Sequence, residues 1–336
     1  MKRMLLVLAL TSPVTLNAQW RITRHYPVGG EGRWDYVVPD PSHHRLFIGR
    51  EDRVMVVDES DGRLLGEVKG IHGAHGTAID LTTGHGFATS GNDSSIVMFD
   101  LSTFAVLGKA HAAEDADAII FDESSRRVFS FNGDAHSATV VEPERGTFVA
   151  NIDLGGKPEY GVSAGDGMVY VNLTDTSEVV EIDARSMRVT RRWSTAPCRQ
   201  PVAMAIDRVH RRLFSGCRSG VMAVSDIAAG KVIATVPIGT GTDGAAFDPA
   251  SGDAFASNAD GTLTVIHEDA PNAYHVSQTI ATATGSRNMG LDTATHRAFV
   301  VGAKFGPAPA QATPANPRRR PAMVPGTFEV MVVERK

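Results

Sequence analysis

A short pattern of apolar and polar residues recurs along the chain. In its first copy, the apolar pair Val37-Val38 leads to Asp40, a polar loop follows, and Arg45 opens a second apolar run that carries Phe47. Two apolar runs joined by a short polar loop are typical of a β-hairpin. Aspartates mark the same place of the frame in six copies, at Asp40, Asp80, Asp122, Asp207, Asp248 and Asp292.

The spacing of these aspartates predicts a repeat protein. Successive gaps are 40, 42, 85, 41 and 44 residues, and the double-length gap contains a degenerate copy from Gly161 to Val171. The copies hold strand-length apolar runs separated by Gly, Asp, Asn and Ser, which disfavours arrays of helical repeats. Units of about 40 to 45 residues with four short strands are typical of propeller blades. We therefore expect an all-β, seven-bladed β-propeller.

The two ends of the chain predict how the last blade closes. The stretch 328–334 matches the third strand of a repeat, and 20–29 matches a fourth strand without a repeat of its own. We expect the N-terminal strand to complete the last blade, because this removes exposed sheet edges. A proline-rich insert, 306–326, interrupts the same blade. It is expected to be a surface loop, either a solvated excursion or a lid or docking arm for an acidic or lipid-headgroup partner.

The first residues have the features of an export signal. Lys2-Arg3 precedes an apolar run, and Ala18 offers a small residue for cleavage. We expect a signal peptide over 1–18 and one propeller domain over 19–336, in the periplasm or secreted, as a monomer without a transmembrane segment after cleavage. An uncleaved anchor is the alternative. Export favours a disulfide between Cys198 and Cys217, against two buried thiols.

Charge narrows the range of partners. The net charge is -5 and the pI about 6.2, and no stripe of Lys or Arg accompanies the repeats. We therefore expect no nucleic-acid partner.

The repeat resembles a known family. Its unit of apolar-Asp, loop, Arg-apolar-Phe and Val-x-Val-Asp is similar to the YncE type of YVTN-repeat β-propeller, a family of exported bacterial proteins. The resemblance extends over essentially the whole chain after residue 18, including the proline-rich insert and 324–333. Because surface-layer propellers and the propeller chain of quinoprotein amine dehydrogenases share this repeat, it implies a fold more than an activity. Two isolated cysteines and three tryptophans do not match the crosslinked cofactor of those dehydrogenases.

Propeller geometry predicts where a site lies. The first strand of each blade lines the centre, so residues about five positions before each anchor aspartate are expected to converge at one mouth of the channel. These positions and their neighbours give the candidate ligand-binding residues Trp34, Asp35, Tyr36, His75, Asp117, Glu159, Tyr160, Arg199, Asp243, Arg287 and Asn288. Four carboxylates and an imidazole, from Asp35, His75, Asp117, Glu159 and Asp243, suit Ca²⁺, Mn²⁺ or Zn²⁺.

Three functions are compatible with this set. The leading hypothesis is a binding or scaffold protein that is not an enzyme and holds a small polar ligand or a partner protein at the channel mouth. The alternative is a metal-dependent lactonase, hydrolase or lyase, in which crowding raises one carboxylate pKa for general-base work. A solvated pore without a ligand is the third. The spacings HExxH, GxSxG, P-loop and CxxC are absent from the sequence, which disfavours the activities that depend on them.

Overall fold

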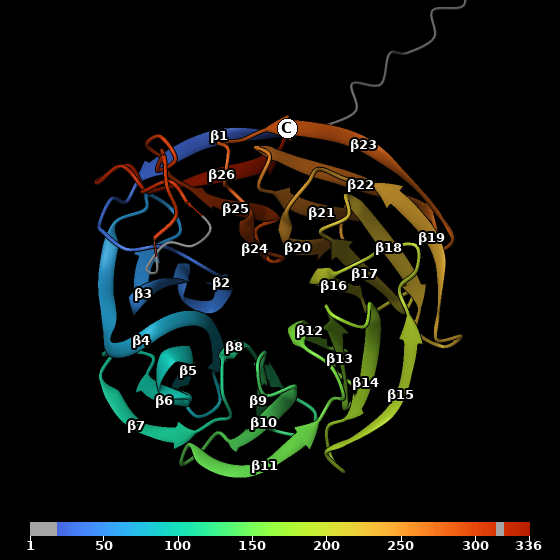
Figure 1. Ribbon diagram of the computed structural model, residues 1–336, viewed down its shortest axis with the longest axis horizontal. Coiled ribbons are helices and arrows are strands. Elements are labelled where there is room, and N and C mark those ends of the chain that lie inside the picture. The colour runs from blue at the N-terminus through green and yellow to red at the C-terminus, as the bar shows by residue number, and fades with distance from the viewer. Residues whose placement is uncertain (1–18, 314–318) are drawn as a thin grey trace, which may run out of the picture.

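The computed structural model describes residues 19–313 and 319–336. The predicted signal peptide over 1–18 lies outside the described residues, as does the centre of the proline-rich insert. In the described part, no helix is long and apolar enough to cross a membrane. The fold is an all-β propeller whose sheets surround a common axis, with the first strand of each sheet nearest the centre (Figure 1).

Five of the sheets contain four antiparallel strands. One consists of β8 (Ala116–Asp122), β9 (Arg127–Asn132), β10 (Ser137–Glu142) and β11 (Thr147–Asp153). The next consists of β12 (Pro158–Ser163), β13 (Met168–Leu173), β14 (Glu178–Asp183) and β15 (Arg188–Ser194). It is followed by β16 (Pro201–Asp207), β17 (Arg212–Cys217), β18 (Val221–Asp226) and β19 (Lys231–Pro237). The fourth is β20 (Thr242–Asp248), β21 (Asp253–Asn258), β22 (Thr262–Ala270) and β23 (Ala273–Ala281). The fifth is β24 (Asn288–Asp292), β25 (Arg297–Gly302), β26 (Glu329–Arg335) and β1 (Trp20–Pro27).

The remaining sheet corrects the predicted number of blades. It has six strands, β2 (Val37–Asp40), β3 (Arg45–Asp58), β4 (Leu64–Asp80), β5 (His85–Ser90), β6 (Ser95–Asp100) and β7 (Val106–His111). The described residues therefore form six hydrogen-bonded blades, and the prediction of seven is wrong. The reason is β4, whose 17 residues run without a break from the last strand of the first sequence repeat into the first strand of the second, while the 14-residue β3 pairs with it. The pair Glu51↔Ala74 continues their ladder across the expected boundary.

The N-terminal strand completes the last blade. Strand β1 pairs antiparallel with β26, from Trp20↔Arg335 to Pro27↔Glu329. The Trp20 indole also reaches the neighbouring sheet, where its Nε1–H donates to Asp253 Oδ2 at 2.7 Å and its ring packs edge-on against Phe255. Burial of a large aromatic side chain with a satisfied N–H stabilises the join between the chain ends.

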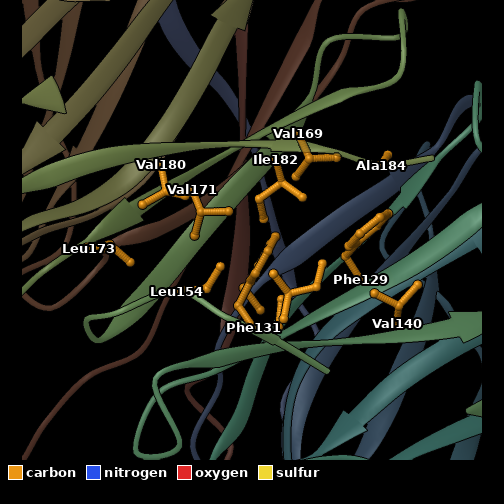
Figure 2. Close-up of a cluster of buried hydrophobic side chains, with 13 residues drawn as sticks. Phe129, Phe131, Val140, Leu154, Val169, Val171, Leu173, Val180, Ile182 and Ala184 are labelled. Carbon is orange, nitrogen blue, oxygen red and sulfur yellow. The ribbon is translucent and has the colours of Figure 1, made fainter. Parts of the chain in front are cut away.

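The hydrophobic core lies between neighbouring sheets. Figure 2 shows one such layer, in which Phe129, Phe131 and Val140 from β9 and β10 pack against Val171 and Ile182 from β13 and β14. All five side chains are fully buried. Alternate residues of each strand face such a layer, so a single blade leaves an apolar face that only its neighbour covers.

The anchor aspartates hold turns. Asp122 is fully buried, and its Oδ2 accepts a hydrogen bond from the backbone N–H of Ser125 at 2.7 Å. Asp80 also joins two repeats, because the Arg126 guanidinium donates to both of its carboxylate oxygens at 2.9 and 2.8 Å. The aspartates are therefore structural residues.

A disulfide joins Cys198 to Cys217, with a Cα–Cα distance of 5.7 Å. Both residues are fully buried. The bridge fixes the loop before β16 to the end of β17.

Candidate ligand site at the inner strands

Five of the eleven candidate site residues lie in irregularities of the sheet. The ladders of the inner strands shift register between Ala74 and Thr77, Ala116 and Ile119, Pro158 and Gly161, and Thr242 and Gly244. His75, Asp117, Glu159, Tyr160 and Asp243 lie inside these four shifts. A bulge redirects side chains and is common beside functional sites. The repeat thus places a redirected polar residue near the axis in sheet after sheet.

Buried hydroxyl groups fix these bulges to one another. Thr89 Oγ1 donates to the backbone carbonyl of Asp117 at 2.6 Å and accepts from the backbone N–H of Gly76 at 3.0 Å. Thr89 is fully buried. The backbone that carries His75 is therefore held at a set distance from the backbone that carries Asp117.

Gly49 gives the backbone of His75 the room that it needs. A Cβ at Gly49 would lie 2.2 Å from the carbonyl oxygen of His75, which is far closer than real Cβ contacts. Gly49 also forms two backbone hydrogen bonds with the segment before β2. Its carbonyl accepts from the Asp35 N–H at 3.0 Å, and its own N–H donates to the Tyr36 carbonyl at 3.1 Å. One glycine thus sets the approach of the Asp35 segment to the His75 segment.

Asp35, His75 and Asp117 form the centre of the site. His75 Nδ1 lies 2.7 Å from Asp35 Oδ2 and 3.5 Å from Asp117 Oδ1. One ligand atom from each residue lies within 4.8 Å of the other two. Burial alone would lower the pKa of His75, but the hydrogen bond to Asp35 and the negative charges of Asp117 and Asp35 raise it to about 9. The imidazole is therefore protonated at neutral pH.

A chain of polar contacts continues from Asp35 to the next blades. Asn288 Nδ2 donates to Asp35 Oδ1 at 3.1 Å and lies 3.5 Å from Asp243 Oδ2. Asp243 is in turn paired with Arg287, whose Nε is 2.8 Å from Asp243 Oδ2. Burial raises the pKa of Asp243 to about 6, although Arg287 opposes the shift. Asp243 therefore titrates below neutral pH, yet well above an ordinary aspartate.

The remaining acidic residues occupy different surroundings. Glu159 Oε1 lies 3.2 Å from an Arg218 guanidinium nitrogen, and burial raises the pKa of the Glu159 carboxyl despite this positive charge. Burial raises the pKa of Asp117 well above its ordinary value, the charge of His75 opposing and that of Asp35 reinforcing the shift. The aromatic rings of Tyr36 and Tyr160 pack against each other, with centroids 5.0 Å apart.

Two acceptor atoms in this group are buried without a hydrogen-bond partner among the described residues. They are Oδ1 of Asp117, which has only the long contact with His75, and Oδ1 of Asn288. Asn288 is 1% exposed. Because an unmade hydrogen bond at a buried acceptor costs about 1–3 kcal/mol, such atoms are expected to accept from something.

The candidate residues divide into three groups. We name the residues Asp35, His75, Asp117, Glu159, Asp243 and Asn288 the inner site, with Arg287, Tyr36 and Tyr160 in contact with it. Trp34 is turned away, and its ring packs against Phe305 and Phe328. Arg199 is exposed, and its described contact is made by its backbone N–H to Ser219 Oγ.

The guanidinium that reaches Glu159 comes from Arg218, which the repeat frame did not single out. It follows Cys217 at the end of β17, and a residue in a loop between strands carries no periodic signal. The equivalent bulge of that sheet, between Pro201 and Ala203, holds the apolar Val202. This sheet therefore supplies its polar group, the Arg218 guanidinium, from the loop after β17 and not from the bulge of its first strand.

Within the inner site, Asp35, His75 and Asp117 are the residues that could hold a divalent cation. A ring nitrogen and carboxylate oxygens suit Mn²⁺ or Zn²⁺, and the carboxylates alone suit Ca²⁺. Because metal binding requires neutral imidazole, a cation bound by His75 must displace a proton from a group of pKa about 9. Glu159 and Asp243 lie outside this cluster and are paired with arginines.

Comparison with known proteins supports the fold alone. No family model matches the chain, and no curated protein gives a significant match. Among solved structures, the chain is similar to Kuenenia stuttgartiensis hydrazine synthase, with a TM-score of 0.68 and 13% sequence identity over 79% of this chain and 91% of that chain. At this identity the similarity shows a shared β-propeller fold. The finer resemblance to YncE-type propellers stays a prediction.

Proposed function

We propose that this propeller is a binding protein that holds a small polar ligand rich in hydrogen-bond donors at the inner site. The observation that carries the proposal is the pair of buried acceptors, Asp117 Oδ1 and Asn288 Oδ1, on the two sides of Asp35. A ligand that donates to both would remove the cost of leaving them unpaired. Binding of this kind needs a preformed polar site on rigid strands, and the bulged inner strands provide one.

The charge of the inner site selects the ligand further. Four carboxylates face the positive charges of His75, Arg287 and Arg218. With all four carboxylates ionised the group carries one more negative than positive charge, so an ammonium or hydroxyl donor is favoured over an anion. In keeping with the resemblance to exported propellers, we propose that binding takes place in the periplasm or outside the cell.

Ethanolamine and choline form a matched pair of probes. Both carry one positive charge and one hydroxyl, but only ethanolamine has N–H donors. Calorimetric titration is expected to show binding of ethanolamine at least about tenfold tighter than choline. Asp117→Asn should weaken ethanolamine binding, whereas Asp175→Asn, on an exposed loop, should leave it unchanged. Equal affinities for the two probes, or an unaffected Asp117→Asn variant, would overturn the proposal.

A metal-dependent hydrolase or lyase is the second candidate. The approach of Asp35, His75 and Asp117 within 4.8 Å favours it. Thermal melts with Mn²⁺, Ca²⁺ and EDTA test this candidate. A rise in Tm with Mn²⁺ that grows between about pH 7 and pH 9 and is lost in His75→Gln supports it, because His75 must lose its proton before it can ligate. Unchanged melts with every cation would remove it.

A further inference from the structure

A pocket beside the inner site has a different character. Its volume is about 800 Å³, and it lies between the loop before β2, the 283–287 segment and the two ends of the proline-rich insert. Its lining residues are Arg33, Trp34, Ala259, Ala283, Thr284, Gly285, Arg287, Ala303, Lys304, Phe305, Arg320, Pro321 and Met323. We name it the basic pocket, because every charged residue of this described lining is a lysine or an arginine.

The insert builds one wall of the basic pocket. Its two ends pair through an antiparallel bridge between Phe305 and Met323. The Gly306 N–H donates to the Ala322 carbonyl at 2.9 Å, and the Val324 N–H donates to the Lys304 carbonyl at 2.8 Å. The base of the insert is therefore a fixed ladder that holds Lys304, Phe305 and Met323 in place.

The opposite wall is held by a buried arginine. Arg50 is fully buried, and its guanidinium donates to the backbone carbonyls of Gly29, Glu31, Gly32 and Arg33. These bonds fix the loop that carries Arg33 and Trp34. The Trp34 ring lies 5.7 Å from the Phe305 ring across the pocket wall, so the two walls meet through an aromatic contact.

The positive charges of the basic pocket are only partly compensated. Arg287 is paired with Asp243 of the inner site. Arg33 and Lys304 form no ion pair with a carboxylate of the described residues, and both are exposed. A cluster of cations beside apolar walls repels itself, and an anion seated there would relieve this repulsion.

We propose that the basic pocket binds an organic monoanion with a flat apolar body, of the class of aromatic carboxylates. Its carboxylate would pair with Lys304 and Arg33, because ammonium and guanidinium groups bind carboxylates through charge-assisted hydrogen bonds. Its ring would lie against Trp34, Phe305 and Met323. The pocket volume falls within the range of small-molecule sites, about 300–1,000 Å³. This site is distinct from the inner site and adjoins it through Arg287.

Three naphthalene derivatives substituted at the same ring position test the proposal by calorimetry. They are naphthalene-2-carboxylate, naphthalene-2-methanol and 2-naphthylmethylammonium, whose substituents are negative, neutral and positive. In Asp117→Asn, where the inner site is weakened, the carboxylate is expected to bind at least about tenfold tighter than the alcohol, and the ammonium not to bind detectably. Added salt should weaken the carboxylate complex.

Variants assign the binding to the basic pocket. The double variant Arg33→Gln, Lys304→Gln should weaken carboxylate binding at least about tenfold, and Phe305→Ala should weaken all apolar binding. Lys231→Gln, on strand β19 of another sheet, removes one positive charge elsewhere and should leave the affinity within about twofold. These residues are exposed, so the variants are expected to fold.

The outcome separates this proposal from the proposed function. Equal binding of the alcohol and the carboxylate, or full carboxylate binding by the double variant, would contradict the proposal that the basic pocket binds an aromatic carboxylate. Asp117→Asn tests the inner site in the same assay. Loss of ethanolamine binding with retained naphthalene-2-carboxylate binding shows two sites, whereas joint loss in this variant would contradict their separation.

Discussion

Asp35 Oδ2 lies 2.7 Å from Nδ1 of His75 and is the closest carboxylate contact that this imidazole makes. The hydrogen bond is the main reason why the pKa of His75 reaches about 9 despite the opposing effect of burial. The two residues come from segments 40 positions apart in the sequence, which is one repeat. The contact therefore shows that successive repeats bring their equivalent residues together near the axis.

Asp35→Asn is expected to lower the pKa of His75, because it removes both a charged acceptor and a negative charge. Proton NMR titration of the histidine resonances measures this directly, with His75→Gln used to assign the signal. The matched control Asp52→Asn removes a carboxylate that is 71% exposed and should leave the titration unchanged. An unshifted His75 in Asp35→Asn would contradict the described contact.

The raised pKa of His75 predicts a loss of stability in alkaline solution. The folded protein holds this proton up to about pH 9, whereas the unfolded chain releases it near the ordinary value of 6.5. The stabilisation is thus complete below about pH 6.5 and disappears as the pH rises through 9, and it contributes about 3 kcal/mol to the free energy of unfolding. Urea unfolding between these pH values measures it. In His75→Gln, the decrease should be smaller by this amount, and an identical decrease would contradict the prediction.

Asp243 predicts a second effect at lower pH. Its pKa of about 6 is above that of an aspartate in the unfolded chain, so the protonated form favours the folded state. This stabilisation is lost as the pH rises from about 4 to 6. Asp243→Asn keeps the neutral form at every pH and should flatten the stability profile in this range. If the stability of the variant depends on pH as steeply as that of the natural protein, other groups cause this dependence.

Gly49→Ala is expected to destabilise the fold and to displace His75. The added Cβ would overlap the His75 carbonyl oxygen at 2.2 Å, and such overpacking typically costs about 1–3 kcal/mol. Gly108→Ala is the matched control, because its Cβ would meet no atom within 4 Å. Thermal melts and the His75 resonance report the two consequences together. If the variant is destabilised but the His75 signal is unchanged, Gly49 does not determine the position of His75.

Removal of the disulfide should weaken the sheet that carries it. Cys198 and Cys217 close a loop of 19 residues, for which loop entropy gives about 3 kcal/mol. The variant Cys198→Ser, Cys217→Ser is expected to unfold at lower urea concentration than the oxidised protein. Reduction of the natural protein is the control, because it breaks the bridge without placing serine hydroxyls at the two buried positions. Equal midpoints for the oxidised protein, the reduced protein and the variant would contradict a stabilising bridge.

Much of the fold could be predicted from the sequence, because burial on both faces of a blade imposes apolar runs of strand length, and polar loops separate them. The anchor Asp122 and the closing strand at Trp20 followed from this pattern. The number of blades did not, since the fusion of the first two repeats depends on backbone pairing at Glu51↔Ala74.

The site could be predicted only in part, for a similar reason. Counting back from each anchor located His75, Asp117 and Asp243, because the bulges recur at the same place in successive ladders. Trp34 and Arg218 lie in loops, where position is set by contacts and not by period. The basic pocket was invisible to the repeat frame, because it joins the loop at Arg33 to the end of the insert at Lys304.

The measurement that tests the inner site most directly is the NMR signal of the His75 ring during titration with ethanolamine. If the ligand donates to Asp117 and Asn288, the His75 resonance should shift in proportion to occupancy, and the shift should vanish in Asp117→Asn. A His75 signal that stays fixed while ethanolamine binds would place the ligand elsewhere and contradict the inner site.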